Sequence, residues 1–265
     1  MSHAAAPARL RLGAVWIDAL TLDAALDRIE RLVDRGQGGA VFTPNVDHVV
    51  LASHDPAFMA AYDRADLSLC DGQPLRWASH LLGAPLPERV SGADVFLPLM
   101  RLAARRGWRV RLLGSGAGMA EEAGKRLARE QGVAIVGASG PTIGAAPLPD
   151  EDALVAQIVA ERPELLIVLL GAPKGELFIA RARARLGAVV AIQLGATLDF
   201  YLGAVRRAPR WMQRAGLEWL YRLLREPRRL AYRYLVRDVR FIPILLGELF
   251  SRRSGRVVPR PSPKD

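Results

Sequence analysis

Apolar residues recur along this chain in two alternating patterns between about residue 10 and residue 200. Short continuous apolar runs are typical of strands buried on both faces of a parallel sheet, and longer stretches with helical spacing are typical of amphipathic helices. The runs predict strands at Arg11–Ile17, Ala40–Pro44, Leu67–Cys70, Arg109–Gly114, Val133–Val136, Leu165–Leu170 and Val189–Leu194. The stretches between them predict helices at Leu22–Val33, Val46–Arg64, Gln73–Leu82, Ala93–Arg106, Met119–Glu130, Asp152–Ala160 and Gly175–Leu186. This alternation predicts an α/β fold, a doubly wound and mostly parallel sheet of the Rossmann-like kind.

The strand pattern ends after Phe200, and the rest of the chain has helical spacing. One apolar helical face is formed by Leu217, Leu220, Tyr221 and Leu224. Pro227 is predicted to open a second helix, because proline is tolerated in a first helical turn. Basic residues on that helix predict one continuous stripe made of Arg229, Arg233, Arg237 and Arg240. We therefore expect an α/β domain at 1–202, a basic amphipathic helical appendage at 203–250 and a disordered tail at 251–265.

The net positive charge lies entirely in the last quarter of the chain. Residues 201–265 carry 15 Arg and one Lys against five acidic residues, a net charge of +11, whereas the whole chain carries +10. A near-neutral body with a cationic helical appendage indicates contact with a polyanionic surface, either anionic lipid or nucleic acid. Tryptophans and leucines along basic helices favour a membrane surface. The expected membrane contacts are Arg225, Arg229, Arg233, Arg237, Trp211 and Trp219.

The cellular compartment is indicated by three features. The single cysteine, Cys70, excludes an internal disulfide and agrees with a reducing cytoplasm. The N-terminal sequence MSHAAAPARLRLG contains no apolar core of signal-peptide length. No apolar run approaches the roughly 20 residues needed to cross a bilayer. We therefore expect a cytoplasmic protein that lies peripherally on the inner face of the cell membrane.

Small and polar residues follow the ends of five predicted strands. Because the carboxyl ends of parallel strands meet at one edge of a sheet, we expect these groups to line one crevice. They are Thr43-Pro44-Asn45, Cys70-Asp71-Gly72, Gly114-Ser115-Gly116-Ala117-Gly118, Gly171-Ala172-Pro173-Lys174 and Gly195-Ala196-Thr197-Leu198-Asp199. The glycine-rich group between a strand and a helix is of a kind that presents backbone N–H groups to phosphate. The segment Gly137–Pro149, rich in Gly, Ala and Pro, is predicted to be a mobile loop over the site.

Several of these groups have a purely structural alternative. Asp71-Gly72 also fits a turn with a helix cap, and Thr43 and Asn45 are ordinary helix-capping types. The Gly114–Gly118 loop lacks the third glycine of a dinucleotide fingerprint, so a nicotinamide site is not expected. Neither the histidines nor the acidic run Asp150-Glu151-Asp152 has metal-ligand spacing at a strand end, and the acidic run fits a charged first helical turn. We expect no metal and no cofactor.

Five segments occur in the order found in one bacterial family: TPNVDHVV, ADLSLCDGQPL, PERVSGADV, GAPKGE and RAPRWMQRAGLEWLYRLLREPRRLAYRY. On these motifs the chain resembles the WecG/TagA/CpsF group, glycosyltransferase family 26, from about Leu10 to Leu249. The resemblance implies an inverting transferase of cell-surface polysaccharide synthesis, exopolysaccharides included. It implies transfer of a hexose or N-acetylhexosamine, of N-acetylmannosamine or glucose type, from a UDP-sugar to a polyprenyl-diphosphate-linked saccharide at the cytoplasmic membrane face.

The resemblance also assigns roles to individual residues. The Thr of the family's TxN motif falls on Thr43, its proposed base on Asp71 and the Arg of its ERxxG motif on Arg89, and these are the expected catalytic residues. The expected substrate-binding residues are Asn45, Gly72, Gly114, Ser115, Gly116, Gly171, Lys174, Gln193, Arg207, Arg210 and Arg222. The chain departs from the family at Gly175, where the family has Gln, and at Gln193, where a small residue is common. Both departures touch the expected pocket, so they bear on donor identity more than on reaction class.

Elementary chemistry fits these roles. Inverting transfer needs one base to take the proton of the acceptor hydroxyl, and a carboxylate at a strand tip beside glycine suits Asp71 to that task. The departing UDP gains negative charge, which Arg89, the N–H groups of the Gly114–Gly118 loop and appendage arginines can stabilise without a metal. The competing hypotheses are a nucleic-acid-binding α/β protein with a basic helical appendage and a nonenzymatic assembly scaffold. The sequence leaves open whether the protein forms a homo-oligomer.

Overall fold

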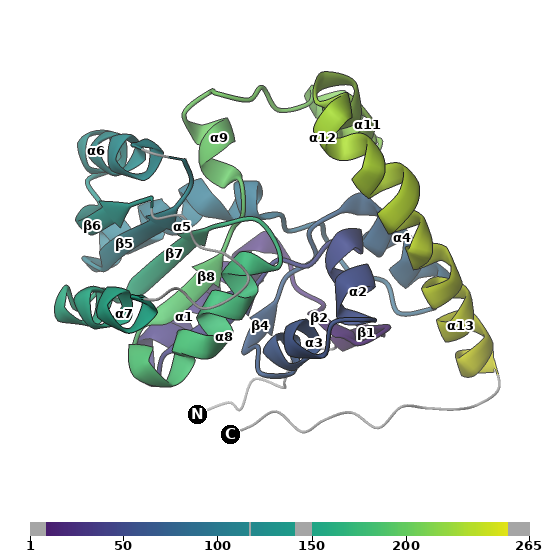
Figure 1. Ribbon diagram of the computed structural model, residues 1–265, viewed down its shortest axis with the longest axis horizontal. Coiled ribbons are helices and arrows are strands. Elements are labelled where there is room, and N and C mark those ends of the chain that lie inside the picture. Colours follow the sequence, from purple (N-terminus) through teal and green to yellow (C-terminus); the bar gives the residue numbers. More distant parts are fainter. Residues whose placement is uncertain (1–8, 117, 141–149, 254–265) are drawn as a thin grey trace.

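The computed structural model describes residues 9–116, 118–140 and 150–253. Within these residues a six-stranded sheet has the order β4-β3-β8-β7-β5-β6, and all of its strand pairs are parallel. The strands are β3 (Gly39–Phe42), β4 (Leu67–Ser68), β5 (Arg109–Gly114), β6 (Ala134–Ser139), β7 (Leu165–Leu169) and β8 (Val190–Gln193). The expected parallel α/β sheet is therefore confirmed, and β8 lies in its interior between β3 and β7 (Figure 1).

Helices cover both faces of the sheet (Figure 1). Side chains alternate between the two faces of a strand, so within β7 Leu166 and Val168 belong to one buried apolar cluster and Leu165 and Ile167 to the other. The first cluster includes residues of α2 (Val46–Ala52), α3 (Pro56–Asp63), α4 (Gln73–Leu81), α7 (Glu151–Ala160) and α8 (Lys174–Leu186). The second includes residues of α1 (Leu22–Asp34), α5 (Gly92–Arg106) and α6 (Met119–Gln131). The continuous apolar strands of the sequence are thus explained by burial from both sides.

Two predicted elements are divided in the structure. The expected strand Arg11–Ile17 is an antiparallel hairpin of β1 (Arg9–Leu12) and β2 (Val15–Asp18), which turns at Gly13 with a φ of +57°. The expected helix Val46–Arg64 is broken between α2 and α3. Asp55 accepts hydrogen bonds from two N–H groups of the α3 first turn, and Pro56 opens that helix. A cap followed by proline ends one helix and starts the next.

Two segments that the sequence predicts to be irregular are partly strand or helix in the structure. Residues 137–139 of the expected mobile loop belong to β6, and residues 141–149 lie outside the described residues. The last helix, α13 (Phe241–Arg253), continues past the expected boundary at residue 250. The remainder of the expected disordered tail, residues 254–265, lies outside the described residues.

The appendage is a chain of helices that crosses the body beside α2 and α4 (Figure 1). It consists of α10 (Arg210–Arg214), α11 (Glu218–Arg225), α12 (Pro227–Tyr232), a π-helix at Arg233–Arg237, a 3₁₀ turn at Asp238–Arg240 and α13, and it follows α9 (Thr197–Tyr201). Pro227 opens α12 as expected. Leu230 and Phe241 are buried, and the Gly13 N–H donates to Glu248 of α13 at 3.2 Å. These contacts hold the appendage against the body.

The expected continuous stripe of basic residues is not what the structure shows. The π-helix changes the angular spacing of the residues after Tyr232. Arg233 and Arg237 turn toward the body and form ion pairs with the buried carboxylate of Asp47 on α2, with Nε–O distances of 3.3 and 2.6 Å. Their guanidinium groups are therefore paired with the body, and the contact of these two arginines with a membrane stays a prediction. The side chain of Arg229 lies outside the described residues.

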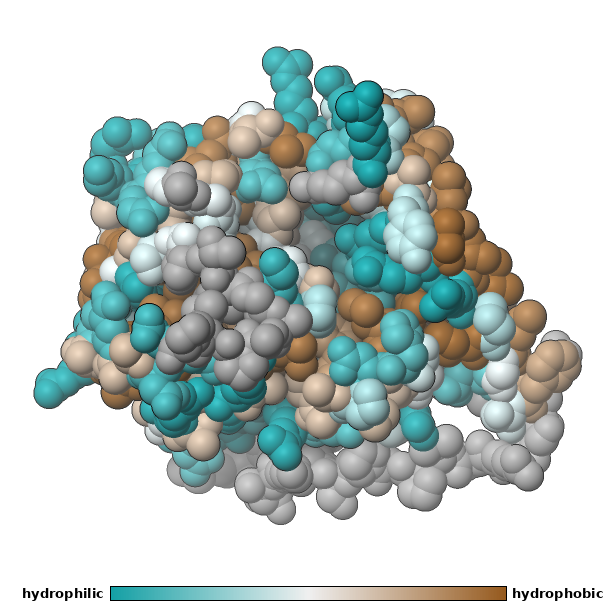
Figure 2. All heavy atoms as spheres, viewed as in Figure 1, coloured by the Kyte–Doolittle hydropathy of each residue, from teal (hydrophilic) through white to brown (hydrophobic). Residues whose placement is uncertain are grey.

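The outer face of the appendage is apolar, and Figure 2 shows this as brown side chains along the edge formed by the C-terminal helices. The exposed residues of this apolar ridge are Leu224, Tyr232, Leu235, Val236, Val239, Ile242, Leu246 and Phe250. Trp211 and Trp219 are also exposed. No helix within the described residues has the length and apolar composition to cross a bilayer.

Candidate active site

The loop after β4 lies between the loop after β3 and the start of α5. The N–H of Asp71 donates to the carbonyl of Pro44 at 2.9 Å, which joins the two strand ends. The N–H of Val90 donates to the carbonyl of Cys70 at 2.8 Å, so Arg89 runs alongside Asp71. Two of the expected catalytic residues, Asp71 and Arg89, are thus brought together from segments that the sequence separates.

Thr43 and Asn45 lie at the same edge, and both also have structural contacts. The buried Thr43 hydroxyl donates to the backbone carbonyl of Gln193 at 3.2 Å, which links the ends of β3 and β8. Asn45 is the N-cap of α2, as the structural alternative proposed. Gly72 has a φ of +130°, a conformation that favours glycine, and Asn45 is its close neighbour. The strand-end loops therefore form one continuous wall.

The electrostatics of Asp71 set it apart from a simple turn residue. Burial raises the pKa of its carboxyl from 3.8 to about 6, and the charges of Glu218 and Asp94 add to this rise. The Arg89 guanidinium opposes the rise, because it favours the charged form. A carboxyl group with such a pKa is ionised near neutral pH yet retains a higher affinity for a proton than an exposed aspartate. This is the property expected of a general base.

Two arginines and two carboxylates form a closed quartet that joins the body to the appendage. Arg89 contacts Asp94 at 3.0 Å and Glu218 at 2.9 Å. Arg207 contacts the same two carboxylates at 2.7 and 3.3 Å and also lies 3.4 Å from the Ser91 hydroxyl. We call Arg89, Asp94, Arg207 and Glu218 the arginine quartet. It places the Arg89 cation next to Asp71, and Arg207 is held by the same two carboxylates as Arg89.

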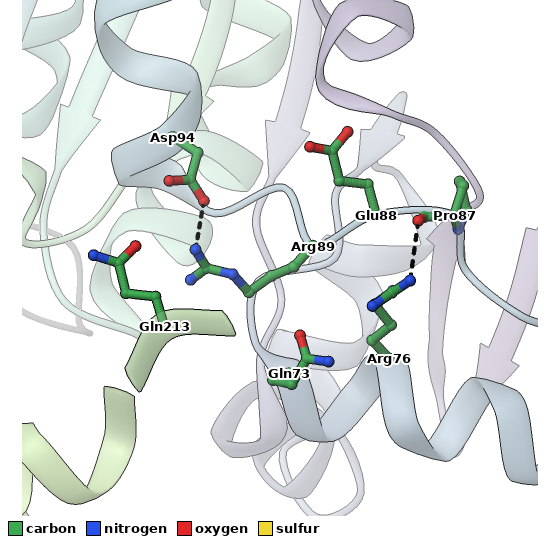
Figure 3. A pocket seen from close by; sticks show the side chains of 7 residues that line it. All are labelled: Gln73, Arg76, Pro87, Glu88, Arg89, Asp94 and Gln213. Atoms are coloured by element: carbon green, nitrogen blue, oxygen red, sulfur yellow. Dashed lines mark hydrogen bonds and ion pairs between the residues drawn. The ribbon is translucent and has the colours of Figure 1, made fainter. Parts of the chain in front are cut away.

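A hollow of about 680 Å³ opens beside the arginine quartet. It is lined by Gln73, Arg76, Pro87, Glu88, Arg89, Asp94 and Gln213. Figure 3 shows Arg89 reaching toward Asp94 across this space, and Gln213 entering it from α10. Asp71 is not one of the lining residues, but it precedes Gln73 by two positions at the start of α4. The hollow therefore lies beside the segment that follows Asp71, and Gln213 of the appendage bounds it on one side.

A buried polar network behind this wall was not anticipated from the sequence. His48 on α2 contacts Asn45 through Nδ1 at 2.8 Å and the fully buried Glu176 through Nε2 at 2.9 Å. The Asn45 side-chain oxygen also accepts from the Asp47 N–H at 3.0 Å and from Arg233 at 3.1 Å. This structural position agrees with the absence of metal-ligand spacing around the histidines in the sequence. Its spacing of three from Asn45, and the glutamate in GAPKGE, were the signals available in the sequence.

The structure separates the remaining expected substrate contacts into two groups. Gly171 and Lys174 are exposed beside the end of β7, and Gln193 ends the neighbouring β8. The loop Gly114–Gly116 follows β5, on the far side of β7 from β8, and has no described contact with Asp71 or Arg89. Its role as a phosphate cradle stays a prediction.

The expected contacts from the appendage differ in how they are placed. Arg207 joins the quartet. Arg222 is half-buried, with its guanidinium 5.8 Å from the centre of the Phe200 ring. Arg225 is exposed beside Tyr221. The side chain of Arg210 lies outside the described residues.

The side chains able to ligate a metal are the acidic, histidine and cysteine side chains of the part of the chain that the structure describes. No three of them cluster closely enough there to hold a metal ion. The acidic run at residues 150–152 begins α7, where Glu151 pairs with Arg181 at 2.6 Å. Its interpretation as a charged first helical turn is confirmed.

Comparison with known proteins gives two further findings. The sequence pattern of the glycosyl transferase WecG/TagA/CpsF family matches residues 10–255. The N-acetylglucosaminyldiphosphoundecaprenol N-acetyl-beta-D-mannosaminyltransferase of Bacillus spizizenii W23 is 33% identical over 198 residues, 74% of this chain and 75% of that protein. The protein of the same name from Bacillus subtilis 168 is 30% identical over 208 residues, 78% of this chain and 79% of that protein.

Proposed function

This chain belongs to the glycosyl transferase WecG/TagA/CpsF family, and we propose that it transfers a sugar from a UDP-sugar to a polyprenyl-diphosphate-linked saccharide with inversion at the sugar carbon. The names of two relatives describe N-acetylmannosamine transfer to N-acetylglucosaminyldiphosphoundecaprenol. We extend that reaction class to this chain, with a donor of N-acetylmannosamine or glucose type. The observation that carries the proposal is Asp71, a carboxyl group with a raised pKa whose nearby cation, Arg89, shares two carboxylates with Arg207.

Asp71 acts as the general base in the proposed reaction. Its carboxylate takes the proton of the acceptor hydroxyl as that oxygen attacks the sugar carbon, while the bond from that carbon to the diphosphate breaks on the opposite side. The pKa of about 6 makes the group both ionised and basic near neutral pH. We propose that the acceptor approaches this carboxylate from the hollow lined by Gln73 and Arg89.

The arginine quartet stabilises the departing UDP. As the bond breaks, negative charge grows on the diphosphate, and guanidinium groups match phosphate oxygens in geometry and charge. Arg89 and Arg207 are held by Asp94 and Glu218 at distances between 2.7 and 3.3 Å. A diphosphate that replaces these carboxylates gains both arginines. We propose that this exchange makes transfer independent of a metal ion and of any cofactor.

The appendage brings the enzyme to its lipid-linked acceptor. The apolar ridge exposes residues such as Leu235 and Phe250, which are 63% and 65% accessible, and exposed arginines such as Arg225 and Arg240 flank it. An amphipathic surface of this kind lies in the headgroup region of a bilayer, where cations attract anionic lipid. The exposed apolar ridge supports lipid over nucleic acid as the partner, because nucleic acid binding favours a cationic groove with stacking aromatics. We therefore propose a peripheral location on the inner face of the cell membrane.

A donor screen tests the proposed function directly. Purified protein is incubated with a lipid-linked N-acetylglucosaminyl diphosphate acceptor and, separately, with UDP-glucose, UDP-N-acetylmannosamine or its uronic acid. We expect release of UDP with only one of these donors, together with a product longer by one sugar. If none of the donors gives UDP release above the rate without acceptor, the transferase proposal fails. An oligonucleotide shift at matched salt tests the nucleic-acid alternative.

A further inference from the structure

The carboxamide of Gln193 is a buried polar group that the mechanism above does not use. Gln193 is the last residue of β8, an interior strand of the sheet, and its side chain is 3% exposed. Its Nε2 donates to the carbonyl of Leu170 at 2.7 Å, and its Oε1 accepts from the N–H of Gly195 at 2.7 Å. Leu170 is the first residue after β7, and Gly195 lies in the loop after β8. One side chain therefore joins two loops at the carboxyl edge of the sheet.

The first turn of α8 leaves room for this carboxamide only because residue 175 is glycine. A Cβ added at Gly175 lies 2.6 Å from Nε2, 2.7 Å from Cδ and 3.2 Å from Cγ of Gln193. Real Cβ atoms essentially never approach another heavy atom so closely, so any other residue at position 175 must displace the carboxamide. Gly175 has no positive φ that would favour glycine for backbone reasons. Packing against Gln193 is thus what requires the missing side chain.

The same residue is also connected to the catalytic wall. Its backbone carbonyl accepts from the Thr43 hydroxyl at 3.2 Å, while its side chain holds the loops on the other side of β8. Movement of Gln193 is therefore transmitted both to Thr43 and to the segment from Gly171 to Lys174. Buried amides with two short hydrogen bonds fix their partners more firmly than surface contacts do.

We propose that Gln193 is a positioning residue for the donor sugar, and that Gly175 is its obligatory partner. The Gln193 carboxamide sets the separation of the loops after β7 and β8, and this separation determines how well the site holds its UDP-sugar. This inference rests on the proposed transferase function. The two residues act as a pair, because the Gln193 carboxamide occupies the volume that a side chain at position 175 would take.

The kinetic test compares Gln193→Met with wild type, using the full chain and the donor identified by the screen. Methionine keeps the length of the side chain but removes both hydrogen bonds. We expect the KM for the donor to rise about tenfold while kcat changes less than about threefold, because an interaction that positions the ground state and the transition state alike acts on KM. Gln157→Met is the matched control, since Gln157 is exposed on α7. A lower Tm without a change in KM would overturn the proposal, because Gln193 would then only stabilise the fold.

A double-mutant cycle tests the pairing without any substrate. Gly175→Ala is expected to lower Tm in the wild-type background, because its methyl group displaces the carboxamide. In a Gln193→Ala background the same methyl group has space, so Gly175→Ala is expected to have little further effect. Additive effects of the two substitutions would overturn the pairing. Failure of every UDP-sugar with wild type would instead refute the proposed function, and the Tm cycle would still decide whether the two residues are coupled.

Discussion

Replacing Asp71 by Asn removes a half-buried negative charge and keeps the shape of the side chain. If Asp71 is the general base, Asp71→Asn should lower sugar transfer by about 10²- to 10⁴-fold, the usual contribution of a positioned base. UDP affinity should stay within a few-fold of wild type, because the diphosphate is bound by the arginine quartet. The same substitution should also make the folded protein more stable, and this second effect comes from the same raised pKa.

The size of the stability gain follows from the pKa of the Asp71 carboxyl. Burial raises that pKa from 3.8 to about 6, and each pKa unit corresponds to about 1.4 kcal/mol. Ionised Asp71 therefore destabilises the folded protein by about 3 kcal/mol. A raised folded-state pKa means that this cost is absent below about pH 4, grows between pH 4 and pH 6 and is complete above pH 6. Asp71→Asn should remove it at neutral pH.

Thermal unfolding at two pH values measures the effect. For a chain of this length, about 3 kcal/mol corresponds to a rise in Tm of roughly 5–10 °C at about pH 8, and the rise should nearly vanish at about pH 4. Asp27→Asn on the exposed face of α1 is the matched control, and its Tm should change little at either pH. A Tm difference for Asp71→Asn that is equal at both pH values, or a loss of Tm at pH 8, would refute the assignment of Asp71 as a destabilised functional carboxylate.

Four further predictions concern the cations, the appendage and the metal. Arg89→Ala should lower turnover and weaken UDP binding, measured by isothermal titration, by about tenfold or more, because it removes one of the two arginines proposed to contact the diphosphate. If neither the rate nor the UDP affinity changes, Arg89 serves only in ion pairs that stabilise the structure. Arg237→Gln should lower the free energy of unfolding, measured by urea denaturation, by about 2–4 kcal/mol, because the buried Asp47 then loses one of its two arginine partners. A change below about 0.5 kcal/mol would mean that the ion pairs of Asp47 contribute little to stability. The double variant Leu235→Glu, Phe250→Glu should no longer co-sediment with anionic vesicles. Its Tm should stay within about 2 °C of wild type, since both side chains are exposed. Vesicle binding equal to wild type would exclude the apolar ridge as the membrane surface. Turnover should survive EDTA, and complete loss that Mg²⁺ or Mn²⁺ restores would contradict the metal-independent reaction.

The central sheet was predictable because its chemistry is local to each segment. Apolar runs such as Leu165–Leu170 are explained by burial from both sides, and the predicted ends of this strand agree with those of β7 to within one residue. The hairpin at Gly13 was missed, because Arg11–Ile17 has an uninterrupted strand-like pattern in which one glycine reverses the chain. The break between α2 and α3 was marked by Asp55-Pro56, a cap and proline signal that the helical periodicity on both sides obscured.

The candidate site was predictable only as far as the strand ends converge. Asp71 follows a strand tip, and that position alone brings it next to Pro44. Its ionic surroundings depend on partners that are remote in the sequence. Arg89 meets Glu218 across 129 positions, and Asp47 meets Arg237 across 190. A single sequence contains no spacing rule for such pairs, and the π-helix after Tyr232 also invalidates the 3.6-residue period on which the basic stripe was based.

The positive charge of the appendage therefore has two separate uses. Arg207, Arg233 and Arg237 face carboxylates of the body, namely Asp94 and Asp47, so their charge attaches the appendage, and in the proposed reaction Arg207 also contacts the diphosphate. What the appendage exposes on its outer face is the apolar ridge. Salt should accordingly weaken membrane binding less than the net charge of +11 implies, because apolar insertion is insensitive to screening and the half-buried ion pairs are screened less than exposed ones. A basic segment in a sequence identifies a surface that meets anions, but it does not say whether those anions belong to a membrane, to a substrate or to the protein itself.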